Sequence, residues 1–73
     1  MIKTIHSKDY QFVIERLKKA RLEAGLTQTQ VASKLNKPQS YVSKAELGER
    51  RLDVTELKIF ADMYKKDIKF FIK

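Results

Sequence analysis

Five side chains that can form hydrogen bonds lie close together near the middle of the chain: Gln39, Ser40, Tyr41, Ser43 and Lys44. A surface helix that serves only solubility usually carries Glu and Lys, whereas amides, hydroxyls and one lysine are suited to the edges of nucleic-acid bases. Gln39 could bond adenine at two points, and Lys44 could donate to guanine. We therefore predict that Gln39, Ser40 and Lys44 contact bases.

A second group of polar and basic side chains is suited to the phosphates of a nucleic acid. Gln28 is expected in the first turn of a helix, where backbone N–H groups and the helix dipole favour an anion. Arg50 and Arg51 follow a second expected helix, a position that suits phosphate contact at least as well as a solvated charged loop. The predicted phosphate-binding residues are Thr27, Gln28, Tyr41, Ser43, Arg50 and Arg51.

Two short helices joined by a tight turn must hold these side chains in place. In the first helix, Thr27 is a good N-cap, and Gln30 completes a capping box three residues later. Asn36 should end this helix, because asparagine tolerates the left-handed backbone conformation of a C-terminal turn. The apolar face of the helix consists of Val31, Ala32 and Leu35.

The second helix of this pair is expected over residues 38–47. Pro38 suits the first turn, where its missing N–H costs nothing, and Gly48 should end the helix. Val42 and Ala45 would face inward, and Val42 would fill the angle between the two helices. The hydrogen-bonding side chains would then face outward.

Capping residues and apolar spacing predict one helix before this pair and one after it. The earlier helix is expected from a cap at Ser7 to about residue 24, with an apolar stripe at helical spacing. The later helix begins after Asp53, and Glu56 completes a second capping box. Both helices would pack their apolar faces against the central pair.

A short apolar segment lies at residues 68–72, where Asp67 can cap a last helix. One of Phe70 and Phe71 should enter the core, and the other should remain exposed beside Ile72. An exposed aromatic patch on a small basic domain indicates a partner surface, although the segment could also fold both rings under. The predicted homodimer interface consists of Ile68, Phe70, Phe71 and Ile72.

A pattern of residues spread over most of the chain is shared with a known family. The matching residues are Arg21, Gly25, Leu26, Thr27, Gln28, Val31, Ala32, Leu35, the run at 38–44, Glu46 and the run at 48–51. On these residues the chain resembles the helix-turn-helix domain of the Xre family, the lambda-repressor and Cro-like DNA-binding proteins. The resemblance implies an all-α, compact five-helix domain whose second and third helices form the helix-turn-helix, with the third in the major groove.

The resemblance also assigns a role to two charged residues. It implies that Arg21 and Glu46 form a buried structural ion pair, which we favour over the alternative of a surface arginine. Lys65 stands where the family often has Gly, so the exit from the preceding helix is expected to be slightly strained or longer. The family commonly pairs through its C-terminal region, which supports the predicted homodimer.

Composition narrows the class of protein. We expect one domain at residues 8–73, preceded by an arm at residues 1–7, and the net charge of +7 suits a polyanionic partner.

The absence of cysteine excludes disulfides and thiolate metal sites and is compatible with the cytoplasm. No long apolar run follows Met1, so neither a signal peptide nor a membrane span is expected. No catalytic motif is recognisable, so we expect no enzyme, no metal and no cofactor.

Together these features predict a sequence-specific, double-stranded DNA-binding transcriptional regulator. We expect a repressor that binds a palindromic operator as a homodimer in the cytoplasm, associated with the nucleoid when bound to DNA. The alternative is an antitoxin or protein-interaction module that covers a toxin or other partner protein and binds DNA for autoregulation. A non-specific nucleoid protein is disfavoured, because it needs basic charge but not Gln39, Ser40 and Lys44 together.

Overall fold

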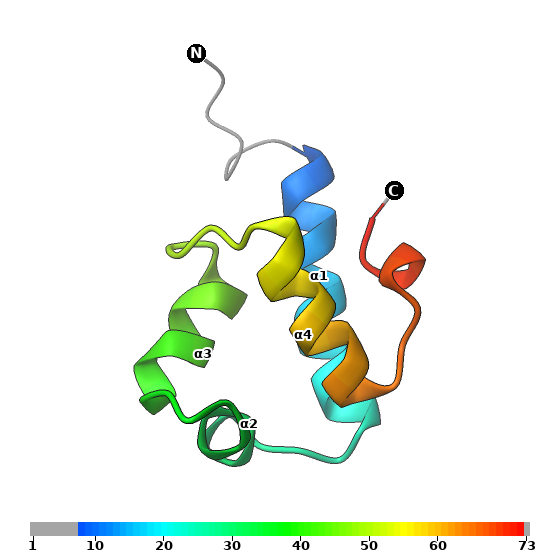
Figure 1. Cartoon of the computed structure of the whole chain (residues 1–73). Helices are drawn as coiled ribbons and strands as arrows, with labels where there is room; N and C mark the ends of the chain where they lie inside the picture. The colour runs from blue at the N-terminus through cyan, green and yellow to red at the C-terminus, as the bar shows by residue number, and fades with distance from the viewer. Residues whose placement is uncertain (1–7, 73) are drawn as a thin grey trace.

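The chain folds as a series of short helices joined by short turns (Figure 1). The computed structural model describes residues 8–72, which form four α-helices, one turn of 3₁₀ helix and no strand. The elements in chain order are α1 (Lys8–Glu23), α2 (Gln28–Leu35), α3 (Gln39–Leu47), α4 (Val54–Tyr64) and η2 (Ile68–Phe70). The predicted all-helical class is confirmed. The predicted arm at residues 1–7, with its cap at Ser7, lies outside the described residues.

α1 contributes one face of the core. Its buried side chains are Val13, Ile14, Leu17, Ala20 and Arg21. The apolar members repeat at helical spacing, as the sequence predicts. The helix ends at Glu23, because the chain turns at Gly25, whose φ of 73° favours a residue without a Cβ atom. Within residues 8–72, no helix is long and apolar enough to cross a membrane.

The capping box predicted at the start of α2 is present. The Gln30 N–H donates to Thr27 Oγ1 over 3.1 Å, and the Thr27 N–H donates to Gln30 Oε1 over 2.8 Å. Asn36 takes the left-handed conformation, with a φ of 58°, and ends α2 as predicted. Both ends of α2 are therefore determined by residues within the helix and immediately beside it.

α3 begins one residue later than predicted. Pro38 has a φ of −68° and a ψ of 155°, so it is the N-cap rather than the first helical residue. The prediction was wrong because the proline ring restricts φ but leaves ψ free to be extended. The Pro38 carbonyl still accepts the Tyr41 N–H over 3.0 Å, and Gly48, with a φ of 80°, ends the helix. α2 and α3 are thus joined by the three residues 36–38.

The core lies where α3 packs against α2 and α1, and where α1 packs against α4. Ala32, on the apolar face of α2, is 3% exposed, and Val42, which was predicted to fill the angle between the two helices, is 0% exposed. Phe60 of α4 and Phe71 are the largest fully buried side chains. This packing holds α3 by its inner face and leaves the outer face open to solvent.

α4 begins with the second predicted capping box and ends at a strained residue. Asp53 Oδ1 accepts the Glu56 N–H over 2.8 Å, and Glu56 Oε1 accepts the Asp53 N–H over 3.0 Å. At the other end, Lys65 has a φ of 58° and a ψ of 44°, in the left-handed region that favours glycine. The strained exit predicted at Lys65 is therefore present.

The expected fifth helix over residues 68–72 is wrong, because only the single turn η2 forms. The Phe70 N–H bonds to the Asp67 carbonyl and the Phe71 N–H to the Ile68 carbonyl, the tighter pattern of a 3₁₀ helix. Phe71 is 0% exposed, and the burial of its ring holds the chain at this turn. Phe71 is therefore a core residue and leaves the predicted dimer interface.

The ring of Phe70 is half-buried and covered by cations. The Arg16 guanidinium lies 4.7 Å from the centre of the Phe12 ring and 4.6 Å from that of Phe70. Lys66 Nζ lies 4.6 Å from the centre of the Phe70 ring. One of the two phenylalanines enters the core as predicted, but the other does not form an open aromatic patch. Ile72, at 50% exposed, remains the most accessible apolar side chain of this segment.

Candidate nucleic-acid interface

The outward face of α3 carries the residues that were predicted to contact bases. Val42 and Ala45 are fully buried and turn the opposite face of the helix toward the core. Gln39, Ser40 and Lys44 are all exposed, and Ser40 and Lys44 lie one turn apart on the same side. The structure therefore brings the three side chains to one solvent-facing surface of a single helix.

Gln39 is bonded to the first residue of α2. Its Nε2 donates to Gln28 Oε1 over 2.6 Å, and Gln28 Nε2 donates in turn to Glu46 Oε1 over 3.0 Å. Gln28 was predicted to contact phosphates alone, and its bonds to Gln39 and Glu46 were not predicted. The one signal in the sequence is that both helices begin with glutamine.

Arg21 and Glu46 form a buried bidentate ion pair between α1 and α3. Arg21 Nε donates to Glu46 Oε2 over 2.7 Å, and Arg21 Nη2 donates to Oε1 over 3.2 Å. The remaining terminal nitrogen, Nη1, donates to the Leu26 carbonyl over 2.9 Å. Only 9% of the arginine side chain and 6% of the glutamate side chain are exposed. The hydrogen bond to Glu46 raises the pKa of Arg21, and the two-pronged contact holds α1 and α3 together.

Two of the predicted phosphate contacts, Tyr41 and Arg50, are joined through a carboxylate. The Tyr41 hydroxyl donates to Glu56 Oε2 over 3.2 Å, and Arg50 Nη2 donates to the same oxygen over 2.8 Å. The Arg50 guanidinium also lies 4.7 Å from the centre of the Tyr41 ring. The Asp53 N–H, Arg50 and Tyr41 together lower the pKa of Glu56. A phosphate must therefore compete with Glu56 for both side chains.

The other predicted phosphate contacts differ in how free they are. The Thr27 hydroxyl oxygen already accepts the Gln30 N–H, and Ser43 is half-buried. Arg51 is exposed, and none of the ion pairs formed within residues 8–72 includes it. Arg51 is therefore better placed than Arg50 to meet a phosphate without giving up an internal contact.

A family model described as helix-turn-helix matches residues 17–71. The chain belongs to this family. It is the Xre, or lambda-repressor-like, helix-turn-helix family of DNA-binding regulators. The match begins inside α1 and includes α2, α3, α4 and η2, so it covers every residue of the face described above. No curated protein matches the chain.

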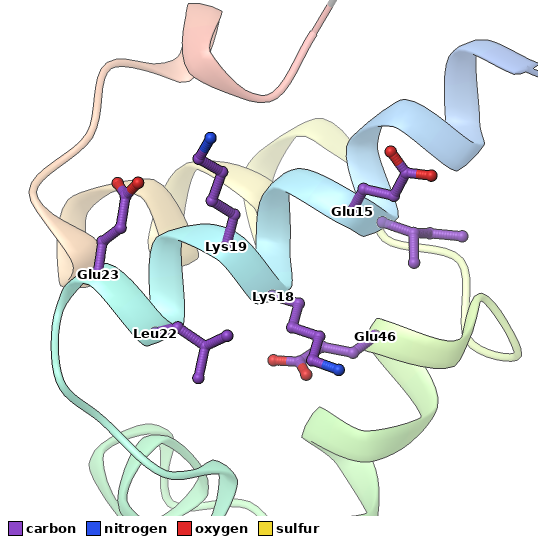
Figure 2. Close-up of a pocket in the computed structure, with 7 residues that line it drawn as sticks. Glu15, Lys18, Lys19, Leu22, Glu23 and Glu46 are labelled. Carbon is purple, nitrogen blue, oxygen red and sulfur yellow. The ribbon is translucent and has the colours of Figure 1, made fainter.

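This helix-turn-helix protein also has an apolar groove on its α1 side. The groove has a volume of about 550 Å³, and most of its side chains come from α1, with Glu46 added by α3 (Figure 2). Ile14 and Leu22 supply its apolar surface, and 58% of Leu22 is exposed. The charged side chains around it are Glu15, Lys18, Lys19, Glu23 and Glu46. None of the predicted base-reading residues lines this groove.

Proposed function

We propose that this protein is a sequence-specific regulator that reads double-stranded DNA with α3 in the major groove, while α2 braces against the backbone. The observation that carries the proposal is the exposed polar face at the start of α3, with Gln39 bonded to the first residue of α2. The major groove admits one α-helix and presents a distinct donor and acceptor pattern for each base pair. A helix whose outer face carries an amide, a hydroxyl and an ammonium group has the donors and acceptors to read that pattern.

In this proposal the interface residues divide between bases and phosphates. Gln39, Ser40 and Lys44 contact base edges. The phosphate contacts are Thr27, Gln28, Tyr41, Ser43, Arg50 and Arg51. The net charge of +7 supports such a division, because basic charge supplies affinity for any sequence while contacts to base edges supply preference.

The proposed regulator acts as a homodimer on a palindromic operator and represses by occluding polymerase. A single domain makes one set of major-groove contacts, and a two-fold dimer doubles them when its recognition helices lie roughly 34 Å apart. The position of η2 supports a dimer contact away from the recognition helix, since η2 lies on the other side of α1 and α4 from α3 (Figure 1). The proposed interface is the exposed part of Ile68, Phe70 and Ile72, without the buried Phe71. Such a protein would work in the cytoplasm, at the nucleoid.

Selection of bound sites from a random pool of double-stranded DNA, at one stated salt concentration, tests this proposal. We expect an enriched palindrome whose half-sites are centred about one helical turn apart. The variant Gln39→Ala is expected to lose preference at one base pair in each half-site, at a cost of about 1–3 kcal/mol. Failure to enrich any sequence would refute specific recognition, and an enriched single half-site would refute the dimer.

A protein-interaction module, such as an antitoxin that covers a toxin, is the second candidate. The observation that favours it is the groove on α1, together with the exposure of Leu22 at 58% and of Leu47 at 67%. In that case DNA binding would serve autoregulation. Co-expression with the product of the neighbouring gene separates the candidates: a complex that is lost in Leu22→Glu and kept in the exposed control Ile59→Glu supports the module. The absence of any complex with that product counts against it.

A further inference from the structure

Four polar side chains form a continuous hydrogen-bonded chain from α1 to the solvent-facing start of α3. Arg21 donates to Glu46 over 2.7 Å and 3.2 Å, Gln28 donates to Glu46 over 3.0 Å, and Gln39 donates to Gln28 over 2.6 Å. This series of hydrogen bonds therefore connects a buried ion pair to Gln39, the residue proposed to read a base. Each bond points in the same direction, toward Glu46.

The direction of these bonds follows from the chemistry of Glu46. An ionised carboxylate can only accept hydrogen bonds, so Gln28 must turn its amide nitrogen toward Glu46. The Gln28 carbonyl oxygen is then left to face Gln39, and Gln39 must in turn present an N–H group to it. Because 94% of the Glu46 side chain is covered and Arg21 holds both of its oxygens, Glu46 is fixed as the acceptor.

We propose that Glu46 is a specificity-determining positioning residue, which sets the orientation of the Gln39 amide through Gln28. This inference rests on the proposed function, in which Gln39 reads a base. With one N–H committed to Gln28, Gln39 keeps one N–H and its carbonyl oxygen for the base. Adenine offers one acceptor, N7, and one donor, the N6 amino group, which match this pair. Guanine offers two acceptors, N7 and O6, and leaves the Gln39 oxygen without a donor.

The variant Glu46→Gln tests the proposal because it should exchange donors and acceptors along this series of hydrogen bonds. The new amide oxygen, in the place of Oε2, keeps the contact with Arg21 Nε, while the amide nitrogen, in the place of Oε1, gives up the contact with Arg21 Nη2 and donates to Gln28, so the Gln28 carbonyl turns inward. The Gln28 nitrogen then donates to the Gln39 oxygen, and Gln39 presents only N–H groups to the DNA. We expect the preference for adenine over guanine at the base pair read by Gln39 to fall by about tenfold or more. Gln39→Ala identifies that base pair.

The control variant Arg21→Lys distinguishes an effect of hydrogen-bond direction from an effect of lower stability of the fold. It removes the two-pronged arginine contact and lowers stability, but Glu46 remains a carboxylate that only accepts. We expect Arg21→Lys to melt earlier and to keep the wild-type base preference. A second variant, Gln28→Leu, removes the link between Glu46 and Gln39 and keeps both residues of the ion pair, so it should reduce discrimination between adenine and guanine even if Glu46→Gln fails to fold.

Base preferences measured by competition binding at one salt concentration, below the melting temperature of every variant, distinguish the outcomes. If the wild type shows no sequence preference, the proposed function itself fails. If the wild type prefers a base other than adenine at the Gln39 position, the function stands and the inference is overturned. The inference is also overturned if Glu46→Gln and Gln28→Leu keep the wild-type preference. It is overturned again if Arg21→Lys changes the preference as much as Glu46→Gln does.

Discussion

Arg50 and Arg51 are neighbours in the chain, but different contacts surround them. Arg50 is bonded to Glu56 and lies over the Tyr41 ring, whereas Arg51 is exposed and belongs to none of the ion pairs within residues 8–72. At the scale of single residues, the two arginines are therefore not equivalent. A substitution at Arg51 should report on DNA alone, and one at Arg50 should also disturb the start of α4.

We predict that Arg51→Ala weakens binding to all DNA sequences alike. Loss of one phosphate contact should flatten the plot of log affinity against log salt by about 0.9, because one fewer counterion is released. Binding isotherms at several salt concentrations, on the selected site and on an unrelated duplex, measure both effects. The control Lys58→Ala removes a positive charge from the exposed pair with Asp62 and should leave the slope nearly unchanged. A change of base preference in Arg51→Ala would instead place Arg51 among the base-reading residues.

The ion pair of Arg21 and Glu46 is predicted to behave as a unit in the free energy of unfolding. Removing one partner, in Arg21→Met or Glu46→Leu, should cost about 3–5 kcal/mol, because a buried charge is left without its partner. The double variant should be more stable than either single variant, since no buried charge then remains. Urea unfolding of the four proteins measures the coupling. Small and additive losses would show that the pair contributes little to the fold.

At the scale of the helices, two positions share one unusual backbone conformation. Lys65 ends α4 with φ 58° and ψ 44°, and Asn36 ends α2 with φ 58° and ψ 45°. Asparagine tolerates this left-handed region, whereas lysine carries a steric cost there. The pair thus offers a matched comparison of the same conformation with two different residues.

We predict that Lys65→Gly raises the free energy of unfolding by about 0.5–1 kcal/mol. Glycine removes the clash of the Cβ atom, although it also adds conformational entropy to the unfolded chain. Asn36→Gly should give a smaller gain or none, because the strain at Asn36 is already low. Thermal or urea unfolding of both variants is the measurement. If Lys65→Gly is no more stable than the wild type, the exit of α4 carries no strain that glycine can relieve.

The capping box of α4 should make stability depend on pH through Glu56. The pKa of Glu56 is lowered from its ordinary 4.5, first by the Asp53 N–H and then by Arg50 and Tyr41. A carboxyl group whose pKa is lower in the folded than in the unfolded state stabilises the fold above its unfolded pKa. That contribution is lost as the pH falls through the folded pKa. We therefore expect the urea midpoint to fall as the pH drops below 4.5.

The variant Glu56→Gln isolates this contribution from those of other carboxylates. Glutamine can still accept the Asp53 N–H, so the helix start is preserved, but it has no proton to take up in this range. Its stability should fall less steeply than that of the wild type as the pH drops below 4.5. If stability falls equally steeply with pH in the wild type and in Glu56→Gln, the pH dependence belongs to other groups, such as Glu23, whose pKa Lys66 lowers.

At the scale of the whole molecule, the exposed apolar side chains lie on more than one surface. Ile72 beside η2 is 50% exposed, and Leu22 in the α1 groove is 58% exposed. Each could form a self-complementary contact in a two-fold dimer. Because the covered Phe70 ring offers less area than an open patch would, a dimer through this segment is expected to be weak and to be favoured by DNA through mass action.

We predict that Ile72→Glu gives a folded monomer, because a charge would enter the apolar centre of the dimer contact. Sedimentation with and without the selected duplex, beside the control Leu22→Glu, measures this. Ile72→Glu should sediment as a monomer and bind the operator poorly, while Leu22→Glu should remain dimeric. If Leu22→Glu is the variant that dissociates, the α1 groove is the interface. A monomeric wild type that binds its site as one copy would contradict the dimer altogether.

Several helix ends of this protein could be predicted from its sequence because each depends on a few neighbouring residues, although the start of α3 was predicted one residue too early. The capping box at Thr27 joins residues only three positions apart, as does the one at Asp53. Asn36 and Gly48 end their helices through their own backbone preferences. Such local rules also placed the outward face of α3, since helical spacing alone separates Val42 from Gln39 and Ser40.

The side-chain partners could not be predicted in this way, because they lie far apart in the chain. Gln28 and Gln39 are separated by 11 positions, and Arg21 and Glu46 by 25, so the crossing of the helices decides whether they meet. The choice between Phe70 and Phe71 is of the same kind. Successive residues of a 3₁₀ turn point about 120° apart, so only the position of the core beside η2 places Phe71 inside and leaves Phe70 to be covered by Arg16 and Lys66.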